Sequence, residues 1–428
     1  MRALVIAAIF ILTTNTQVLA QTKTAMKGIP PSPESQVTLE NYRNQPFSHW
    51  SFRHTGAFFN TLDIARAGKI HRYKARENKT VAALGWREQQ DKNLQMLLAE
   101  NATDGFLVLK NNKILFERYF GGMQARDKHI WFSMTKSLVS SAAGILVEQG
   151  LLDLRKSPAD YIPELQNSGF ERVTVQQVLD HSSALDFKEN YTDLTSEFAR
   201  FYAPALSMGF MPGARDLAPG EDVIYGVHDF LGDYVKADSS LKPGEAFDYN
   251  SANADVLGWL VARISGQPLH EYLEQNIWSK LHTEHDAFIS ADRAYMAVAT
   301  GGMNSTLRDA ARFGQMILQR GKYKGAQIVP ANWVDASLTL TEANKNNMRN
   351  NPKYKNMPWQ AYHNMWWILN ADSGEYAAVG IHGQVIYINR SANTVIAWFS
   401  SQQKASAANN PQFNAKLAVS REIAEALQ

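Results

Sequence analysis

A serine and a lysine three positions apart stand out in the stretch WFSMTKSLVS, which covers residues 131–140. If a helix begins at Ser133, Lys136 lies about one turn further on, and both side chains project from the same face. A lysine among apolar neighbours loses its charge more readily than usual, so it can accept the proton of a serine hydroxyl. The pair could therefore act as nucleophile and base. It could equally be an N-cap serine followed by a solvated lysine.

The surroundings of Ser133 distinguish it from two other copies of the same pattern. Ser-x-x-Lys also occurs at residues 239–242 and 401–404, where it lies in a polar loop and in a loop rich in glutamine and alanine. Ser133 instead follows a β-rich segment and precedes residues 134–151, in which apolar side chains recur at helical spacing up to a closing glycine. Only this copy is expected where a sheet meets a long apolar helix.

The elements that must position this pair are expected on both sides of it in the chain. Residues 106–120 read as two strands around the paired asparagines 111–112, which tolerate the positive φ of a tight hairpin turn. Residues 376–389 and 394–402 are further β-rich runs, and residues 414–428 read as a closing amphipathic helix. The sheet is therefore expected to be split in sequence by a mostly helical block.

This pattern predicts two packed domains and an arm. Residues 21–45 are polar and proline-bearing, which is typical of an extended segment laid over a domain. Residues 46–154 and 336–428 are expected to form the sheet domain, and residues 155–335 a mostly helical domain.

The first twenty residues have the pattern of a secretory signal. Arg2 precedes an apolar run over residues 3–12, and Val-Leu-Ala at residues 18–20 forms a small-residue cleavage site. The apolar run is too short to span about 30 Å of hydrocarbon. We therefore expect cleavage after Ala20, no integral membrane segment afterwards, and a periplasmic or secreted location.

Composition excludes several classes of protein. The 428 residues carry 43 basic and 41 acidic side chains, so no charge asymmetry indicates nucleic acid or an anionic membrane as a partner. The chain has no cysteine, which rules out disulfides, a thiol nucleophile and cysteine-type zinc sites. The stretch HTEH at residues 282–285 has metal-like spacing but no third ligand nearby. We expect neither a metal nor another cofactor.

Three ordered motifs carry a family resemblance. WFSMTKS is followed by FDYNSANADVLGWLVARISG at residues 247–266 and by GIHGQVIYINR at residues 380–390. Together they resemble the serine β-lactamase and penicillin-binding-protein superfamily, in its class C-like and esterase-like branch, and most of all the 6-aminohexanoate-oligomer (nylon oligomer) hydrolases. The resemblance covers the chain from about Asn41 to the closing helix. It implies a mixed α/β fold, with an antiparallel sheet covered by helices on both faces and an inserted helical domain.

The resemblance implies roles for three side chains. Ser133 would be the acylated nucleophile, Lys136 its partner, and Tyr249 the group that shuttles protons between nucleophile, lysine and leaving group. A lysine ammonium nearby would shift the Tyr249 phenol toward phenolate.

The third motif departs from the family pattern and leaves two frames open. In the preferred frame it is Ala-Val-Gly at residues 378–380, without the usual basic residue, and the backbone N–H groups of Ser133 and Ile381 would form the oxyanion hole. In the other frame it is His382-Gly383, and Gln384 would supply the second N–H. The missing basic residue weakens any expectation of carboxylate-bearing β-lactam substrates.

Three residues are predicted on the substrate side. LDFKENYTD at residues 185–193 resembles the loop in which a tyrosine reaches the substrate amide in the nylon-oligomer hydrolases, and Tyr191 falls in that place; it could instead be a loop aromatic that packs on the helical block. Trp366, or its neighbour Trp367, is expected to line the pocket, and His382 is grouped with the substrate-binding residues.

These observations predict an exported serine hydrolase that acts on small esters or amides through an acyl-enzyme. Two alternatives stay open at this point. One is a DD-peptidase or β-lactamase acting on cell-wall or antibiotic substrates, and the other is a non-catalytic relative that binds a partner. The sequence leaves the oligomeric state open.

Overall fold

The computed structural model describes residues 25–86, 89–191, 193, 195–207, 224–354, 357–407 and 410–428. The predicted signal at residues 1–20 lies outside this part of the chain. Within it, no helix is long and apolar enough to cross a membrane.

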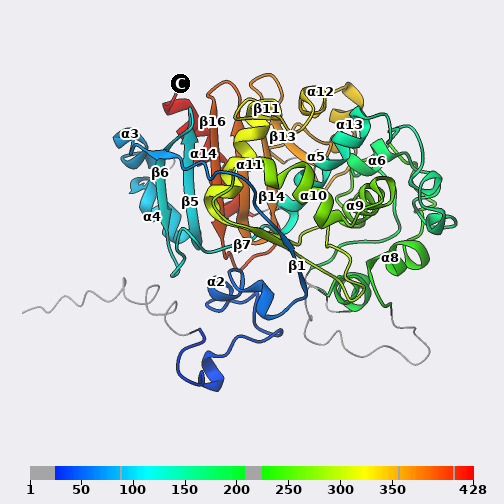
Figure 1. Cartoon of the computed structure of the whole chain (residues 1–428), viewed down its shortest axis with the longest axis horizontal. Coiled ribbons are helices and arrows are strands. Elements are labelled where there is room, and N and C mark those ends of the chain that lie inside the picture. The colour runs from blue at the N-terminus through cyan, green and yellow to red at the C-terminus, as the bar shows by residue number, and fades with distance from the viewer. Residues whose placement is uncertain are drawn as a thin grey trace, which may run out of the picture.

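An eight-stranded sheet forms the centre of the molecule (Figure 1). Its strands follow one another in the spatial order β12 (Ala361–His363), β13 (Trp366–Asn370), β14 (Glu375–Gly380), β15 (Gln384–Asn389), β16 (Thr394–Ser400), β5 (Thr103–Lys110), β6 (Lys113–Tyr119) and β2 (Lys74–Ala75). Neighbours are antiparallel, except that β2 runs parallel to β6 at the edge. Because β16 pairs with β5, the split of the sheet in sequence is confirmed.

The hairpin between β5 and β6 forms where the paired asparagines predict it. Asn111 and Asn112 have φ values of 51° and 59°, and Lys110 pairs with Lys113 on either side of them. Two successive positive φ values suit the right-handed twist of the flanking strands.

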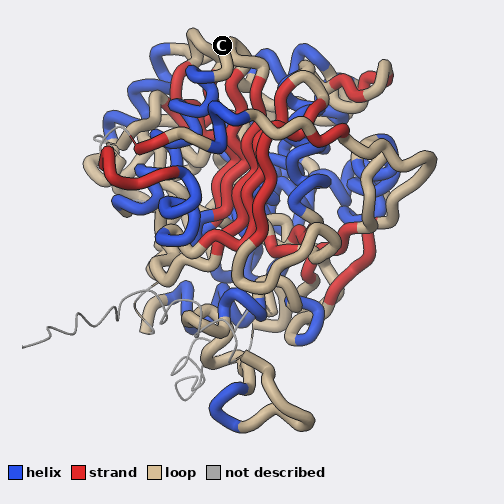
Figure 2. The backbone as a smooth tube through the Cα atoms, turned by 90° about the vertical axis from the view of Figure 1, so that its left-hand side faces the viewer, coloured by secondary structure: helices blue, strands red, loops and turns tan. Residues whose placement is uncertain are grey.

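Helices cover both faces of this sheet, as Figure 2 shows in a view turned by 90°. Gly314 of α11 (Leu307–Leu318) packs against Val395, while Lys416 of α14 (Pro411–Ala426) lies over Trp398. Residues an odd number apart in a strand point to opposite faces, so α11 and α14 lie on opposite sides of β16. The expected mixed α/β fold, with a sheet covered on both faces, is confirmed.

The helical part of the molecule packs around α5 (Thr135–Glu148). Helix α9 (Ala252–Ser265) packs against α5 and also against α6 (Val175–Leu179) and α10 (Leu269–Asn276). Beside them lies a second, four-stranded sheet that the sequence did not predict, in the order β1 (Thr61–Ile64), β8 (Ala287–Ser290), β9 (Met303–Ser305) and β7 (His129–Ile130).

The division at residues 155 and 335 stays a prediction, and two features bear on it. Helix α11 falls in the block expected to be helical, yet it packs on strands of the main sheet. The four-stranded sheet joins β1 and β7 from one expected domain with β8 and β9 from the other.

The remaining α-helices and strands are short and connect the larger ones. Among the described residues they are α2 (Ser48–Ser51), α3 (Lys79–Ala82), α4 (Leu94–Glu100), α7 (Ala203–Ala205), α8 (Val227–Asp229), α12 (Ala331–Ala336), α13 (Glu342–Asn350), β3 (Gly85–Trp86), β4 (Gln89–Asn93), β10 (Lys322–Tyr323) and β11 (Ala326–Gln327). The described part of the arm, residues 25–45, forms turns, one isolated bridge and one 3₁₀ turn. Gln45 ties its end to the body through hydrogen bonds to Ser401 O and to Gln403, each 2.9 Å long.

Candidate active site

Ser133 lies on a tightly held 3₁₀ turn, Phe132–Met134, directly before α5. Phe132 has a φ of 45°, a conformation that a bulky residue adopts only when its surroundings hold it there. The Thr135 hydroxyl donates to Phe132 O (2.7 Å), and Trp131 N donates to Met303 O (2.8 Å). The backbone around Ser133 is therefore fixed from both sides, which presents its hydroxyl at the start of the helix.

Lys136 reaches back from the first turn of α5 to Ser133. Its Nζ lies 2.9 Å from Ser133 Oγ and 3.0 Å from Ser251 Oγ. It also donates to Thr300, at 2.9 Å to the carbonyl oxygen and 2.8 Å to the hydroxyl. Lys136 is only 1% exposed, so the alternative of a solvated first-turn lysine is wrong.

Burial sets the proton affinity of this amine. Loss of solvent lowers the pKa of Lys136 to about 8, although the nearby carboxylates of Glu189 and Asp255 act in the opposite direction. A lysine with an ordinary pKa is charged near neutral pH and cannot accept a proton. The lowered pKa of Lys136 gives it a substantial neutral fraction, which a general base requires.

Asp255 lies behind this amine on α9. Its carboxyl accepts the Thr300 N–H (2.9 Å) and the Tyr202 hydroxyl, and burial raises its pKa to about 7. Thr300 thus links Asp255 to Lys136, because it accepts from the amine and donates to the carboxyl. No local sequence pattern indicates this link, since Thr300 lies 164 positions from Lys136.

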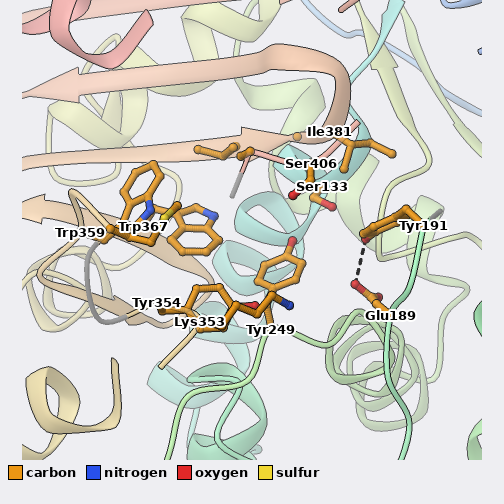
Figure 3. Close-up of a pocket in the computed structure, with 14 residues that line it drawn as sticks. Ser133, Glu189, Tyr191, Tyr249, Lys353, Tyr354, Trp359, Trp367, Ile381 and Ser406 are labelled. Carbon is orange, nitrogen blue, oxygen red and sulfur yellow. Dashed lines mark hydrogen bonds between the residues drawn. The ribbon is translucent and has the colours of Figure 1, made fainter. Parts of the chain in front are cut away.

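Tyr249 completes the group around Ser133. Figure 3 shows its hydroxyl directed toward Ser133, and Lys136 Nζ lies 5.1 Å from the centre of its ring. Burial raises the pKa of Tyr249 well above its usual value, and the Glu189 carboxylate raises it further, while a hydrogen bond with Ser133 acts the other way. The expected shift toward phenolate is therefore corrected: burial and the Glu189 charge keep the pKa high, and Tyr249 is a neutral phenol that can donate a proton.

The end of β14 meets the Ser133 turn, and its geometry bears on the two frames of the third motif. Ile381 follows Gly380 directly and lines the same pocket as Ser133. Gln384 begins the next strand instead, where its buried side chain accepts from Ser400 N (3.0 Å) and donates to Ser400 O (2.6 Å). This geometry favours Ile381 as the residue whose N–H faces an oxyanion together with that of Ser133.

A pocket opens in front of these residues and encloses about 620 Å³ of empty space, open solvent included. Its walls are mainly aromatic and apolar, with Ser133 and Tyr249 at its base, and it is lined by Glu189, Tyr191, Lys353, Tyr354, Met357, Trp359, Trp367, Val379, Gly380, Ile381, Ser406 and Ala407. In Figure 3 the rings of Trp359 and Trp367 lie to one side of Tyr249, and the Tyr191–Glu189 pair lies to the other.

The structure brings one of the three predicted substrate-side residues, Tyr191, to this pocket. Trp366 is corrected: it is 2% exposed and stacks on Phe313 in the core, while Trp367 lines the pocket. Adjacent residues of β13 point to opposite faces, so only one of the two tryptophans can face the site.

His382 is also corrected, because it lies behind the pocket wall. It is 2% exposed between Phe52 and Phe132, with ring centroids 5.1 Å and 5.4 Å away, and its Nδ1 lies 2.7 Å from Gln402 O. It is not among the residues that line the pocket with Ser133. Burial lowers its pKa to about 3, which makes it a neutral structural residue.

A second pocket also reaches Ser133 and Tyr191. It encloses about 430 Å³ of empty space, again with open solvent included. It shares Ser133, Tyr191 and Ile381 with the first pocket, and it is lined further by Arg43, Phe132, Phe198, Tyr202, Ala203, Leu206, Ser251, Thr300 and Gly301. The nucleophile candidate therefore lies where two largely apolar pockets meet.

Glu189 links Ser251 to Tyr191 by hydrogen bonds. No role was assigned to it from the sequence. One carboxylate oxygen accepts the Ser251 N–H (2.7 Å), and the other accepts the Tyr191 hydroxyl (2.8 Å). It thereby fixes Tyr191 and places a negative charge near Lys136. In the described part of the chain no group of three or more His, Cys, Asp or Glu side chains could hold a metal ion.

Comparison with known proteins assigns the class. The family model described as Beta-lactamase matches residues 91–419, so the chain belongs to the Beta-lactamase family and is a serine hydrolase of that fold.

Individual proteins resemble the chain over most of its length. The chain is 31% identical over 372 residues to the 6-aminohexanoate-dimer hydrolase of Paenarthrobacter ureafaciens, covering 87% of this chain and 90% of that protein. A solved structure of a candidate 6-aminohexanoate-dimer hydrolase from Bacillus anthracis superimposes with a TM-score of 0.79 at 27% identity, over 91% of this chain and 97% of the other. A D-stereospecific amidohydrolase from Streptomyces, at 16% identity, a TM-score of 0.52 and coverage of 73% and 94%, shares the fold alone.

Proposed function

We propose that the chain hydrolyses small linear amides and esters through an acyl-enzyme on Ser133. Ser133 Oγ attacks the substrate carbonyl carbon while Lys136 takes the hydroxyl proton. The N–H groups of Ser133 and Ile381 hold the resulting oxyanion. Tyr249 passes a proton to the leaving nitrogen or oxygen as its bond to carbon breaks, and it regains a proton from Lys136. Water then attacks the acyl-enzyme by the reverse transfers and releases the acid.

One observation carries this proposal: a buried amine whose pKa is lowered to about 8 lies 2.9 Å from a hydroxyl that opens onto a pocket. A structural lysine would need no contact with a hydroxyl at the pocket floor. A merely binding relative would need no general base there.

The shape of the site supports a linear substrate. Two apolar pockets meet at Ser133, so a chain can extend in both directions from a scissile carbonyl. Lys353 on the wall of the larger pocket adds a cation that suits a carboxylate at the end of such a chain. The name of the Paenarthrobacter relative agrees with this class, since a 6-aminohexanoate dimer is a linear amide. The third motif carries no basic residue at residues 378–380, which argues against β-lactams.

A substrate panel tests the proposed function. We expect turnover of p-nitrophenyl butyrate and of the 6-aminohexanoate dimer, with kcat/KM for nitrocefin at least about a hundredfold lower than for the ester. The Ser133→Ala variant serves as the blank for each substrate. Efficient nitrocefin or D-alanyl-D-alanine peptide cleavage, without cleavage of the linear amide, would instead assign a β-lactamase or DD-peptidase.

The pH dependence of kcat/KM tests whether Lys136 is the general base. The neutral form of Lys136 is the active one, so kcat/KM for the ester should rise with pH and reach half its plateau near pH 8. The Glu189 carboxylate stabilises the ammonium and raises the Lys136 pKa. Glu189→Gln removes that charge and keeps an acceptor for Tyr191, so the midpoint should move to lower pH. A pH–rate series for both proteins checks this, and an unchanged or higher midpoint would contradict it.

Export is part of the proposal. The charged start, short apolar run and small-residue cleavage site in residues 1–20 support secretion of the enzyme to the periplasm or beyond. N-terminal sequencing of the protein from a periplasmic fraction should begin at Gln21, and an uncleaved protein retained in the cytoplasm would contradict export.

A further inference from the structure

A second buried lysine lies under the turn that carries Ile381, and the proposed mechanism does not use it. Lys416 projects from α14, with no measurable exposure. Its Nζ donates to Gly383 O (2.8 Å) and to the Ser400 hydroxyl, and it lies 4.5 Å from the centre of the Trp398 ring. Two oxygens and an aromatic face thus surround the amine. Burial lowers its pKa well below the usual value, so an apolar residue would be easier to accommodate here.

The turn above Lys416 has a backbone that needs support. It spans Ile381–Gly383 between β14 and β15, with positive φ at His382 (59°) and Gly383 (89°). A non-glycine residue in this region is strained and persists only when its neighbours hold it. The Gln384 side chain holds Ile381 O at 3.3 Å, and His382 N donates to Ala405 O (2.9 Å).

The contact with Lys416 is close enough to shape this turn. A Cβ added to Gly383 would lie 2.6 Å from Lys416 Nζ, so the amine is packed directly against the glycine backbone. Gly383 is buried, so loss of the amine donor would leave its carbonyl without this hydrogen bond and with no water to replace it. Lys416 therefore fixes one end of a three-residue turn whose other end carries Ile381.

From this we infer that Lys416 is a positioning residue for the oxyanion hole: it holds the Ile381–Gly383 turn from below so that the Ile381 N–H stays aimed at the carbonyl bound at Ser133. This inference rests on the proposed acyl transfer, in which that N–H carries developing negative charge. Its effect should appear in the transition state rather than in substrate binding, because an oxyanion donor interacts most strongly once the tetrahedral oxyanion forms.

The test is Lys416→Met, which keeps the bulk of the side chain and removes its donors. We expect kcat for p-nitrophenyl butyrate to fall about tenfold to a hundredfold, with KM changed by less than about threefold. The rate of phosphonylation by a fluorophosphonate, whose phosphoryl oxygen uses the same N–H groups, should fall by a similar factor. Affinity for a boronic acid that forms a tetrahedral adduct should weaken in parallel, while inhibition by the carboxylate product should not change.

Val419→Ala is the matched control. Val419 is buried on the same helix and lines a different cavity with Leu94 and Leu97, so this variant should lose stability with little change in kcat. A folded Lys416→Met protein with wild-type kcat and phosphonylation rate would overturn the inference, and so would an equal loss of kcat in Val419→Ala.

A milder variant keeps the inference testable if Lys416→Met does not fold. Ser400→Ala removes one of the two oxygen partners of Lys416, and it should lower kcat and the phosphonylation rate by about threefold to tenfold. Wild-type values in Ser400→Ala would then count against the positioning role. Failure of the wild-type protein itself to react with the fluorophosphonate would overturn the proposed function rather than this inference alone.

Discussion

Lys136→Met is expected to lower kcat/KM for ester hydrolysis by roughly four orders of magnitude or more, the loss typical when one member of a catalytic group is removed. The methionine fills a similar volume but cannot accept the Ser133 proton, and the four oxygen contacts of Nζ are lost together. Steady-state kinetics with p-nitrophenyl butyrate measure the effect.

Thermal stability should separate catalysis from folding in this variant. A buried amine is expensive to desolvate, so its replacement by an apolar side chain should leave the melting temperature unchanged or change it by only a few degrees. Ser141→Ala is a matched control on the same helix, because the Ser141 hydroxyl bonds to the Ser137 carbonyl one turn back (2.8 Å) and not to the site. It should keep wild-type activity. A folded Lys136→Met protein with more than about one hundredth of wild-type activity would show that another group is the base.

Gly380→Ala is expected to have the second largest effect, a fall of about a hundredfold in kcat, which corresponds to roughly 3 kcal/mol at the transition state. The backbone of Gly380 is extended (φ −120°), so alanine introduces no conformational strain. Its Cβ would lie 2.3 Å from Trp131 O, however, and real contacts of this kind exceed 3 Å. The end of β14 must therefore move away from the Ser133 turn, which widens the space between the N–H groups of Ser133 and Ile381.

The kinetic signature of Gly380→Ala should be a loss of kcat with a smaller change in KM, because the oxyanion contact strengthens in the transition state. Gly56→Ala controls for the general effect of the substitution, since a Cβ there meets Thr61 at an ordinary 3.8 Å. Wild-type kcat in Gly380→Ala would contradict the assignment of this strand end to the oxyanion hole.

Local patterns predicted the core of the site because their geometry is local. Ser133 and Lys136 are one helical turn apart, so any helix that begins there brings them together. The hairpin turn likewise depends on two adjacent asparagines. The split of the sheet could be predicted because β-rich runs occur both before and after the helical block. Family resemblance added Tyr249, which lies far from Ser133 in sequence but beside it in space.

The incorrect and missing residue predictions have physical causes that no local sequence pattern reveals. Trp366 and Trp367 differ by one position in a strand, and a shift of one residue reverses the face of every side chain. His382 was misplaced because tertiary packing buries its ring between Phe52 and Phe132. Thr300 and Lys416 act through tertiary contacts alone, 164 positions from Lys136 and 33 positions from Gly383 respectively.

The site of covalent labelling identifies the nucleophile. The purified protein is treated with a fluorophosphonate, its intact mass is determined, and the modified peptide is sequenced by mass spectrometry. We predict a single adduct on Ser133, none in Ser133→Ala, and a greatly slowed reaction in Lys136→Met. An adduct on another serine, or labelling that persists in Ser133→Ala, would show that Ser133 is not the nucleophile.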